Sequence, residues 1–203
     1  NNKTLLVNIL YVNNESGTLQ AIEKICALIR ERAPNAFILG DFVQAWGKVE
    51  FSMRKIDVDF AIFSGHKIHG PKGNGLLYFR GKSLPTPLIH GGGQQNNMRS
   101  GTENLAGLRA MAMASRMQKE SFTVRKARTQ KFRDKLANHI ERLGGIINFP
   151  HSIPEIMNVS FPGLRGETIL HMLEAKEVFI STSSACQARS GRISHVLEAI
   201  AMP

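Results

Sequence analysis

The sequence predicts an α/β fold built on a mostly parallel β-sheet. Apolar runs at residues 4–11, 36–41, 57–64 and 75–79 indicate buried strands, and an amphipathic stretch at 18–32 separates the first two. Parallel strands that are covered on both faces carry continuous apolar runs of this kind. The order of strand, helix, strand and further strands is typical of an α/β sheet.

The remaining sequence indicates two further regions. A loop rich in glycine, proline and asparagine, residues 80–102, precedes a long stretch with helical pattern, and short alternating strands and helices follow. We therefore predict that residues 1–102 form part of a large sheet domain. Residues 103–145 are predicted to form a connecting helical region, and residues 146–203 part of a smaller C-terminal α/β domain.

Composition restricts the classes of function. The 203 residues carry a formal net charge of +10, with many of the basic residues at 116–142. We interpret that stretch as one or two helices with solvated basic faces, because no nucleic-acid-binding motif accompanies it, and we do not expect direct nucleic-acid binding. No apolar run approaches the length of about 20 residues that spans a bilayer, and the first residues do not match a signal peptide. These features predict a cytoplasmic protein.

The two cysteines differ in their surroundings. Two are too few for a disulfide framework. Cys26 lies in the amphipathic stretch and is expected to be a buried, small apolar side chain. Cys186 lies among serine, alanine and glycine residues, which suits either a nucleophilic or redox-active thiol or an incidental surface thiol. His195, farther along, could be a base, a helix cap or a surface residue.

One lysine stands in an unusual setting. The segment FSGHKIHGPKGNG, residues 63–75, places Lys67 directly after an apolar strand and among glycines that allow tight turns. A lysine amine can form a Schiff base with an aldehyde when its surroundings lower its pKa. Pyridoxal phosphate (PLP) is a common aldehyde cofactor, and it needs a lysine, an acid for its ring nitrogen and a group of phosphate donors.

Other residues at predicted strand ends could meet those needs. Asp41 ends the strand before the strand of Lys67 and could pair with a ring nitrogen, and Gln44 could donate to the ring's phenolic oxygen. Ser64 and His66 flank the lysine and offer donors to a phosphate. Taken singly, each has an ordinary alternative, because an aspartate after a strand is often a helix cap and a Gly-His-Lys triplet is often a surface turn.

Several motifs together resemble a known family. The segments VNNESG, DFVQAWGK, FSGHKIHGPKGNGLLYFR, HGGGQQNNMRSGTENLAG, IMNVSF and SSAC followed by ISHVLEAI occur in the order and spacing of NifS/IscS-like cysteine desulfurases. These enzymes belong to the class V aminotransferase group of PLP-dependent fold type I proteins. The resemblance covers essentially the whole chain and implies part of a PLP-binding large domain with a smaller C-terminal lobe.

The resemblance also implies roles for individual residues. The cofactor would be held by the side chains of Asn14, Asp41, Gln44, Ser64, His66, Lys67 and Thr102. Lys67 would form the Schiff base, and Thr102 would reach the phosphate of a partner subunit, which implies a homodimer. Cys186 would take sulfur from L-cysteine as a persulfide, leaving L-alanine. No metal is implied.

The resemblance leaves alternatives open. Family members have a longer N-terminal part with a ring-stacking histidine and a phosphate-binding turn, and a later arginine that binds the substrate carboxylate. None of these has a counterpart here, so the resemblance implies a fragment lacking N- and C-terminal parts. The sulfur acceptor would be an iron–sulfur scaffold or a tRNA-thiolation enzyme. A selenocysteine lyase, a cysteine sulfinate desulfinase, or a non-catalytic fragment that binds a partner are the alternatives.

Overall fold

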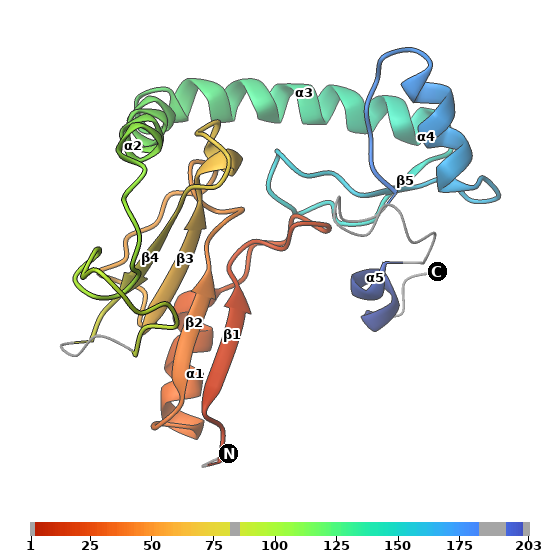
Figure 1. The fold of residues 1–203 in the computed structure, drawn as a ribbon. Coiled ribbons are helices and arrows are strands. Elements are labelled where there is room, and N and C mark those ends of the chain that lie inside the picture. The colour runs from red at the N-terminus through yellow and green to blue at the C-terminus, as the bar shows by residue number, and fades with distance from the viewer. Residues whose placement is uncertain (1–2, 82–85, 183–193, 201–203) are drawn as a thin grey trace. The chain divides into compact units, whose positions relative to one another are not determined.

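A computed structural model describes residues 3–81, 86–182 and 194–200 (Figure 1). The chain divides into two compact units. The first unit comprises Asn1–Val12 and Gln20–Thr123, and the second comprises Asn13–Leu19 and Val124–Pro203. This division rests on contacts within the chain, and the domain boundaries at residues 102 and 145 stay a prediction.

The first unit contains a four-stranded sheet in the order β1-β2-β3-β4. Its elements are β1 (Leu6–Leu10), α1 (Ile22–Arg32), β2 (Phe37–Asp41), β3 (Phe60–Ser64) and β4 (Gly75–Phe79). The first three strands pair in parallel, and β4 pairs with β3 in the antiparallel direction. Because α1 connects two parallel neighbours, it is the crossover that such strands require. The predicted α/β class with a mostly parallel sheet is confirmed.

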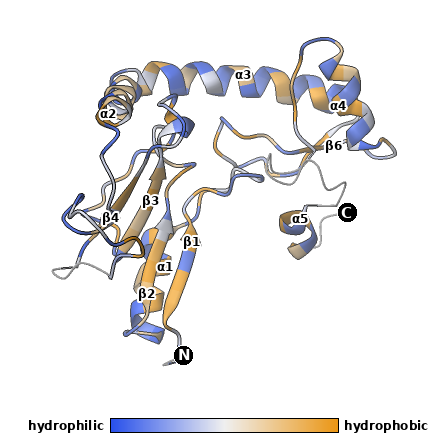
Figure 2. Cartoon of the chain, in the orientation of Figure 1, coloured by the Kyte–Doolittle hydropathy of each residue, from blue (hydrophilic) through white to orange (hydrophobic). Residues whose placement is uncertain are grey.

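The two faces of this sheet differ in burial. Successive side chains of a strand point to opposite faces, so Ile38, Gly40, Ala61 and Phe63 share one face, and all four are buried. The other face carries Phe37, which is 56% exposed. Figure 2 shows β1 and β2 as largely hydrophobic ribbons. Asp41, at the end of β2, belongs to this second, more open face.

An ion-pair network lies at the amino ends of β2 and β3. Arg30 of α1 pairs with Asp57 and Asp59 at 3.0 Å each and donates to the carbonyl of Ala36 at 2.9 Å. Arg80, which follows β4, pairs with the other oxygen of Asp57 at 2.9 Å. The Asp59 carboxylate also accepts the N–H of Ile38. These contacts tie α1, the entry to β2, the entry to β3 and the exit from β4 together.

Helices dominate the rest of the chain. The predicted helical stretch forms two helices, α2 (Leu105–Glu120) and α3 (Phe122–Arg142). They separate at Ser121, whose hydroxyl donates to the carbonyl of Met117 at 2.7 Å. A serine that bonds back to the preceding turn competes with helix continuation. None of the helices in the described ranges is long and apolar enough to cross a membrane.

The second unit holds a small sheet and short helices. Its elements after α3 are β5 (Ile146–Ile147), β6 (Val159–Ser160), α4 (Gly166–Glu174) and α5 (His195–Ala199), and β5 pairs with β6 in the antiparallel direction. Arg133 of α3 is only 7% exposed and donates to the carbonyls of Phe149, Ile153 and Ile156. It also donates to the Ser152 hydroxyl at 2.8 Å. Arg133 of the basic stretch therefore has a structural role.

Candidate functional site

The carboxyl ends of β2 and β3 bring two of the predicted residues to one face of the sheet. Asp41 pairs in register with Ile62, and Ser64 lies two residues farther along β3. Because side chains alternate along a strand, Asp41, Ile62 and Ser64 point to the same face. A rise of about 3.3 Å per residue and a strand spacing of about 4.8 Å place the Cα atoms of Asp41 and Ser64 about 8 Å apart.

Asp41 is half-buried and holds the turn that follows β2. Its Oδ1 accepts the N–H of Val43 at 2.9 Å, so the carboxylate closes a turn, and no helix follows for it to cap. The N–H of Phe42 donates to the carbonyl of Ile62 at 3.0 Å, which fixes this turn against β3. A carboxylate has two oxygens and about four acceptor positions, so one local hydrogen bond leaves acceptor capacity for a ring N–H.

Gln44 follows on the same turn. Its Oε1 lies 3.2 Å from the ammonium of Lys48, and its backbone carbonyl lies 3.3 Å from the same atom. Since the carboxamide oxygen faces a cation, the NH₂ group is the part of the side chain that can serve another acceptor. This orientation suits a donor to a phenolic oxygen.

Lys67 lies on a short 3₁₀ helix, η1 (Gly65–Ile68), directly after β3. Ile68 of this helix is 1% exposed, whereas the side chain of Lys67 lies in solvent. The buried isoleucine anchors the turn, because it is the apolar side chain that η1 turns inward. The amine of Lys67 is therefore presented at the end of the strand and open to a ligand.

Close backbone packing fixes the position of η1. The N–H of Gly65 donates to the carbonyl of Asn74, and the N–H of Gly70 donates to the carbonyl of Gly65, both at 2.9 Å. A Cβ atom at Gly70 would lie 2.9 Å from that Gly65 oxygen. The motif therefore needs glycine at position 70. Met111 of α2 packs beside Gly65, where an added Cβ would meet its sulfur at 3.1 Å.

Ser64 and His66 form a hydrogen-bonded pair. The Ser64 hydroxyl and Nδ1 of His66 are 2.7 Å apart. A serine and a neutral histidine carry one polar hydrogen each, and only one of the two hydrogens can occupy this contact. The other remains available on either the hydroxyl or Nε2, so the pair can donate at least one hydrogen bond to an anion.

The other predicted residues lie elsewhere. Asn14 is exposed in a turn of the second unit, and Thr102 is exposed in the loop before α2. His195 is the first residue of α5, whose N-cap is Ser194. Cys186 lies outside the described residues. Cys26 is fully buried, as predicted, and burial followed by the nearby Asp57 carboxylate raises the pKa of its thiol.

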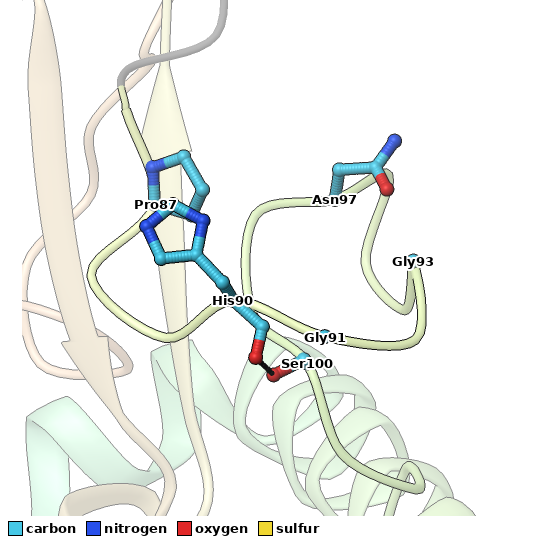
Figure 3. A pocket seen from close by; sticks show the side chains of 6 residues that line it. All are labelled: Pro87, His90, Gly91, Gly93, Asn97 and Ser100. Carbon is cyan, nitrogen blue, oxygen red and sulfur yellow. Dashed lines mark hydrogen bonds between the residues drawn. The ribbon is translucent and has the colours of Figure 1, made fainter.

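Two pockets lie away from Lys67. One pocket, of about 190 Å³, lies within the loop that carries Thr102. His90 and Ser100 line it, and the Ser100 hydroxyl donates to the carbonyl of His90 at 2.8 Å (Figure 3). A larger one of about 690 Å³ lies beside Trp46 and Phe51 in the first unit. Neither is lined by Asp41 or Lys67.

The donor set at the strand ends nevertheless fits PLP. An accessible amine, a half-buried carboxylate with acceptor capacity, and a Ser–His donor pair supply the three kinds of group that the cofactor needs. By contrast, the described ranges contain no cluster of three or more histidine, cysteine, aspartate or glutamate side chains able to hold a metal ion. Lys67, Asp41, Ser64 and His66 can therefore hold this cofactor.

Sequence reasoning missed the residues that support η1. Asn74 provides the carbonyl that bonds Gly65, and Gln118 of α2 donates to the carbonyl of Ile68 at 3.3 Å. Gly107 lies so close to the Asn74 side chain that an added Cβ would fall 2.4 Å from its Oδ1. The signal for Asn74 and Gly107 was present in the motifs GPKGNG and NLAG, but spacing alone does not reveal that they touch.

Comparisons with known proteins identify the family. The class V aminotransferase family model matches residues 1–200. A protein named cysteine desulfurase IscS from Clostridium botulinum is 36% identical over 207 residues, covering 99% of this chain and 52% of the relative. A NifS/IscS protein homologue from Lactobacillus delbrueckii is 38% identical over 98% of this chain and 53% of the relative.

Solved structures give the same result. A NifS-like protein matches with a TM-score of 0.90 and 37% identity, over 98% of this chain and 52% of that chain. A NifS-like protein from Rickettsia africae matches with a TM-score of 0.87 and 27% identity, over 98% and 53%. The predicted fold type I architecture is confirmed, and the chain spans about half the length of the relatives it matches. The chain therefore belongs to the class V aminotransferase family, whose members depend on PLP.

Proposed function

We propose that this chain is part of a PLP-dependent cysteine desulfurase that converts L-cysteine to L-alanine and takes up the sulfur as a persulfide on Cys186. One observation carries the proposal. Asp41, the Ser64–His66 pair and Lys67 follow one another at the carboxyl ends of two neighbouring parallel strands. Ligands of open α/β sheets bind at such strand ends.

The residues at the strand ends would hold the cofactor. The Asp41 carboxylate would accept the ring N–H, and the Gln44 amide would donate to the phenolic oxygen. Ser64 and His66 would donate to the phosphate. When bound, PLP stabilises negative charge at the substrate Cα. Asn14 and Thr102 complete the proposed set of cofactor-binding residues. In a homodimer, Thr102 would bind the phosphate of the partner subunit's cofactor.

Two side chains would act on the substrate. The neutral amine of Lys67 would accept the proton from the substrate Cα and later deliver a proton to the carbon that loses sulfur. The thiolate of Cys186 would attack the substrate sulfur, so that an S–S bond forms as the C–S bond breaks. The carbon keeps the electron pair of the broken bond and gains a proton, which gives the methyl group of L-alanine.

The proposal also includes the cellular location of the reaction and the acceptor of the sulfur. We place the reaction in the cytoplasm and the sulfur acceptor among proteins that build iron–sulfur clusters or thiolate tRNA. Several relatives that are 34–38% identical are named cysteine desulfurase IscS, which supports the desulfurase over other family activities.

Covalent labelling tests the role of Lys67. The chain is incubated with PLP and reduced with borohydride, and the labelled peptide is identified by mass spectrometry. We expect the label on Lys67 and its loss in Lys67→Ala. Lys72→Ala, a change at an exposed lysine of the same loop, should keep it. A label spread evenly over surface lysines in both variants would refute the anchor.

Sulfide release separates the desulfurase from its alternatives. Release from L-cysteine under reducing conditions should be lost in Cys186→Ser, because the sulfur has no acceptor thiol. Activity on selenocysteine or cysteine sulfinate that survives this substitution would instead support a selenocysteine lyase or a desulfinase. Labelling of Lys67 with no turnover of any of the three substrates would support the partner-binding alternative.

A further inference from the structure

One side of α3 is occupied by contacts within the second unit, to which the helix belongs from residue 124 onward. Arg133 is 7% exposed and donates to three carbonyls of the loop after β5. Thr129, Ala137 and Ile140 lie four or seven positions from Arg133 and are half-buried, so they share this side of the helix. These contacts determine which side chains of α3 are left on the outside.

Three apolar side chains lie along the outside of α3. Phe132, Leu136 and Leu143 are 59%, 53% and 70% exposed, and their spacing of four and seven positions places them on one side of the helix. Leu143 directly follows α3, and its N–H still donates to the carbonyl of His139 at 3.2 Å, as in a helix. With a helical rise of about 1.5 Å per residue, this apolar row is about 17 Å long, which matches about three turns of a partner helix.

Four exposed cations flank the apolar row. Arg128, Lys131, Lys135 and Arg142 follow one another at intervals of three, four and seven positions, so they form a basic row on the helix surface. None of the four forms an ion pair with another described residue. The guanidinium carbon of Arg128 lies 5.4 Å from the centre of the Phe132 ring, so the two rows touch. Uncompensated charge therefore borders an exposed apolar surface.

The acidic residues of α3 do not neutralise the basic row. The Asp134 carboxylate accepts a hydrogen bond from the Gln130 amide at 2.7 Å, and Glu141 lies seven positions farther along the same side of the helix. The chain as a whole carries a formal net charge of +10. A second copy of the chain would therefore bring cations against cations, whereas an acidic partner would compensate them.

We propose that this side of α3 is a docking surface for an acidic amphipathic helix of another protein. The apolar side chains of that helix would pack on the apolar row, and its carboxylates would pair with the basic row. RNA would compensate the cations but leave Leu136 and Leu143 in water, because its bases stack on aromatic rings. An anionic membrane takes up a wide apolar helix face, whereas the apolar row is narrow and lies beside the side that Arg133 holds in the fold.

Two designed peptides test the proposal on the 203-residue chain. Both form one amphipathic helix with leucines at the same positions, and they carry either glutamate or lysine at the polar positions. Fluorescence anisotropy measures the affinity of each labelled peptide. We expect the glutamate peptide to bind and the lysine peptide not to bind. Added salt should weaken the binding, because the pairs with the basic row are exposed to solvent.

Substitutions in the two rows locate the binding. Lys131→Glu combined with Lys135→Glu should weaken binding of the glutamate peptide about 10-fold, because two attractive charges become repulsive. Phe132→Ser should weaken it about 10-fold, because the partner loses an apolar anchor. Lys176→Glu and Phe179→Ser change exposed residues of the same unit outside α3, and they should leave the affinity unchanged. Circular dichroism checks the fold of each variant, and if Phe132→Ser unfolds, the charge variant decides.

Several outcomes would overturn the proposal. These are no binding of the glutamate peptide, equal binding of the lysine peptide, or equal affinity for the wild type and the charge variant. Phosphatidylserine vesicles or polyuridine that bind through the basic row in place of the glutamate peptide would assign the surface to a membrane or to RNA. A dimer in sedimentation that Phe132→Ser dissociates would show that a second copy covers the apolar row. All these readouts need neither cofactor nor substrate, so they stand even if labelling of Lys67 fails.

Discussion

The two ends of the sheet use their charged residues in opposite ways. At the amino end of β2 and β3, four charged side chains, Arg30, Asp57, Asp59 and Arg80, bond one another and the nearby backbone. At the carboxyl end, Lys67 and His66 are exposed, and the latter contacts only the neighbouring Ser64 hydroxyl among the hydrogen bonds of the described residues. One end therefore holds the fold together, while the other presents groups to a ligand.

The contrast shows how the partners of a charged residue at a strand end distinguish a structural role from a binding role. Asp57 and Asp41 both border the same sheet, and both are half-buried. Asp57 accepts two guanidinium groups from distant parts of the chain, whereas Asp41 accepts one backbone N–H two residues away. A carboxylate with distant cationic partners stabilises the fold, and one with only a local partner keeps capacity for binding. The following predictions test that distinction.

The largest expected effect is loss of the network at the amino end. Arg30→Ala should lower the free energy of unfolding by about 2–4 kcal/mol, because Asp57, Asp59 and the Ala36 carbonyl lose a common donor while partly buried. Burial lowers the pKa of Arg30, but the hydrogen bonds that it donates to Asp59 and Asp57 outweigh this effect and raise the pKa. Urea unfolding followed by circular dichroism measures the change.

A matched control lies on the same helix. Arg32 is 73% exposed, and its ion pair is with the adjacent Glu31. Arg32→Ala should change the free energy of unfolding by less than about 0.5 kcal/mol, as is usual for exposed ion pairs. Similar losses in the two variants would mean that the network at the amino end contributes no more than a surface pair.

The next largest effect is expected at the carboxyl end and concerns backbone packing. Gly70→Ala should cost about 1–3 kcal/mol, because the new Cβ would press on the Gly65 carbonyl at 2.9 Å and displace η1. Labelling of Lys67 by PLP should fall in the same variant. Gly73→Asn is the control, since its φ of +77° suits asparagine and no atom lies within 4 Å of an added Cβ. Equal behaviour of the two variants would contradict this view of η1.

Sequence patterns were sufficient to predict the strands of the sheet and the order of the site residues along the chain. Four apolar runs predicted the four strands within a few residues. The expectation of buried, parallel strands was wrong for β4, which pairs in the antiparallel direction and leaves Leu76 and Leu77 about half exposed. The positions of Asp41, Ser64 and Lys67 after those strands followed from chain order alone. The amphipathic pattern around Cys26 likewise predicted its burial.

Long-range polar contacts could not be predicted from the sequence. Arg133 is one of many basic residues in the stretch 116–142, and only the fold shows that the loop after β5 surrounds its guanidinium with carbonyls. The bond between Glu15 and Ser194 joins residues 179 positions apart. The end of α2 at Glu120 was also unmarked, because neither a glycine nor a proline stands between α2 and α3.

A smaller loss of folding stability is expected at high pH, and it comes from Cys26 on α1. Cys26 is fully buried, and burial, with a further contribution from Asp57, raises the pKa of its thiol in the folded chain. A raised folded pKa gives stability that is complete below the unfolded pKa of about 8.5 and is lost as pH rises. Between pH 7 and pH 9.5 this thiol should account for about 1 kcal/mol of lost stability.

Cys26→Ala isolates that contribution. The variant is less stable at pH 7 because it loses buried volume, but its free energy of unfolding should decline less steeply toward pH 9.5. Tyr11, whose pKa is also raised by burial and then by Glu23, remains in both proteins and cancels in the comparison. Parallel declines in the two proteins would show that the Cys26 thiol titrates alike in the folded and unfolded chains.

The smallest expected effect is the stability change at Lys67. Because its side chain is exposed, Lys67→Ala should alter the free energy of unfolding by less than about 0.5 kcal/mol. The same substitution should abolish covalent labelling by PLP, so function and stability separate completely at this position. Urea unfolding without cofactor measures the first quantity, and mass spectrometry measures the second. A loss comparable to that of Arg30→Ala would mean that Lys67 supports the fold, and the distinction between the two ends of the sheet would not hold.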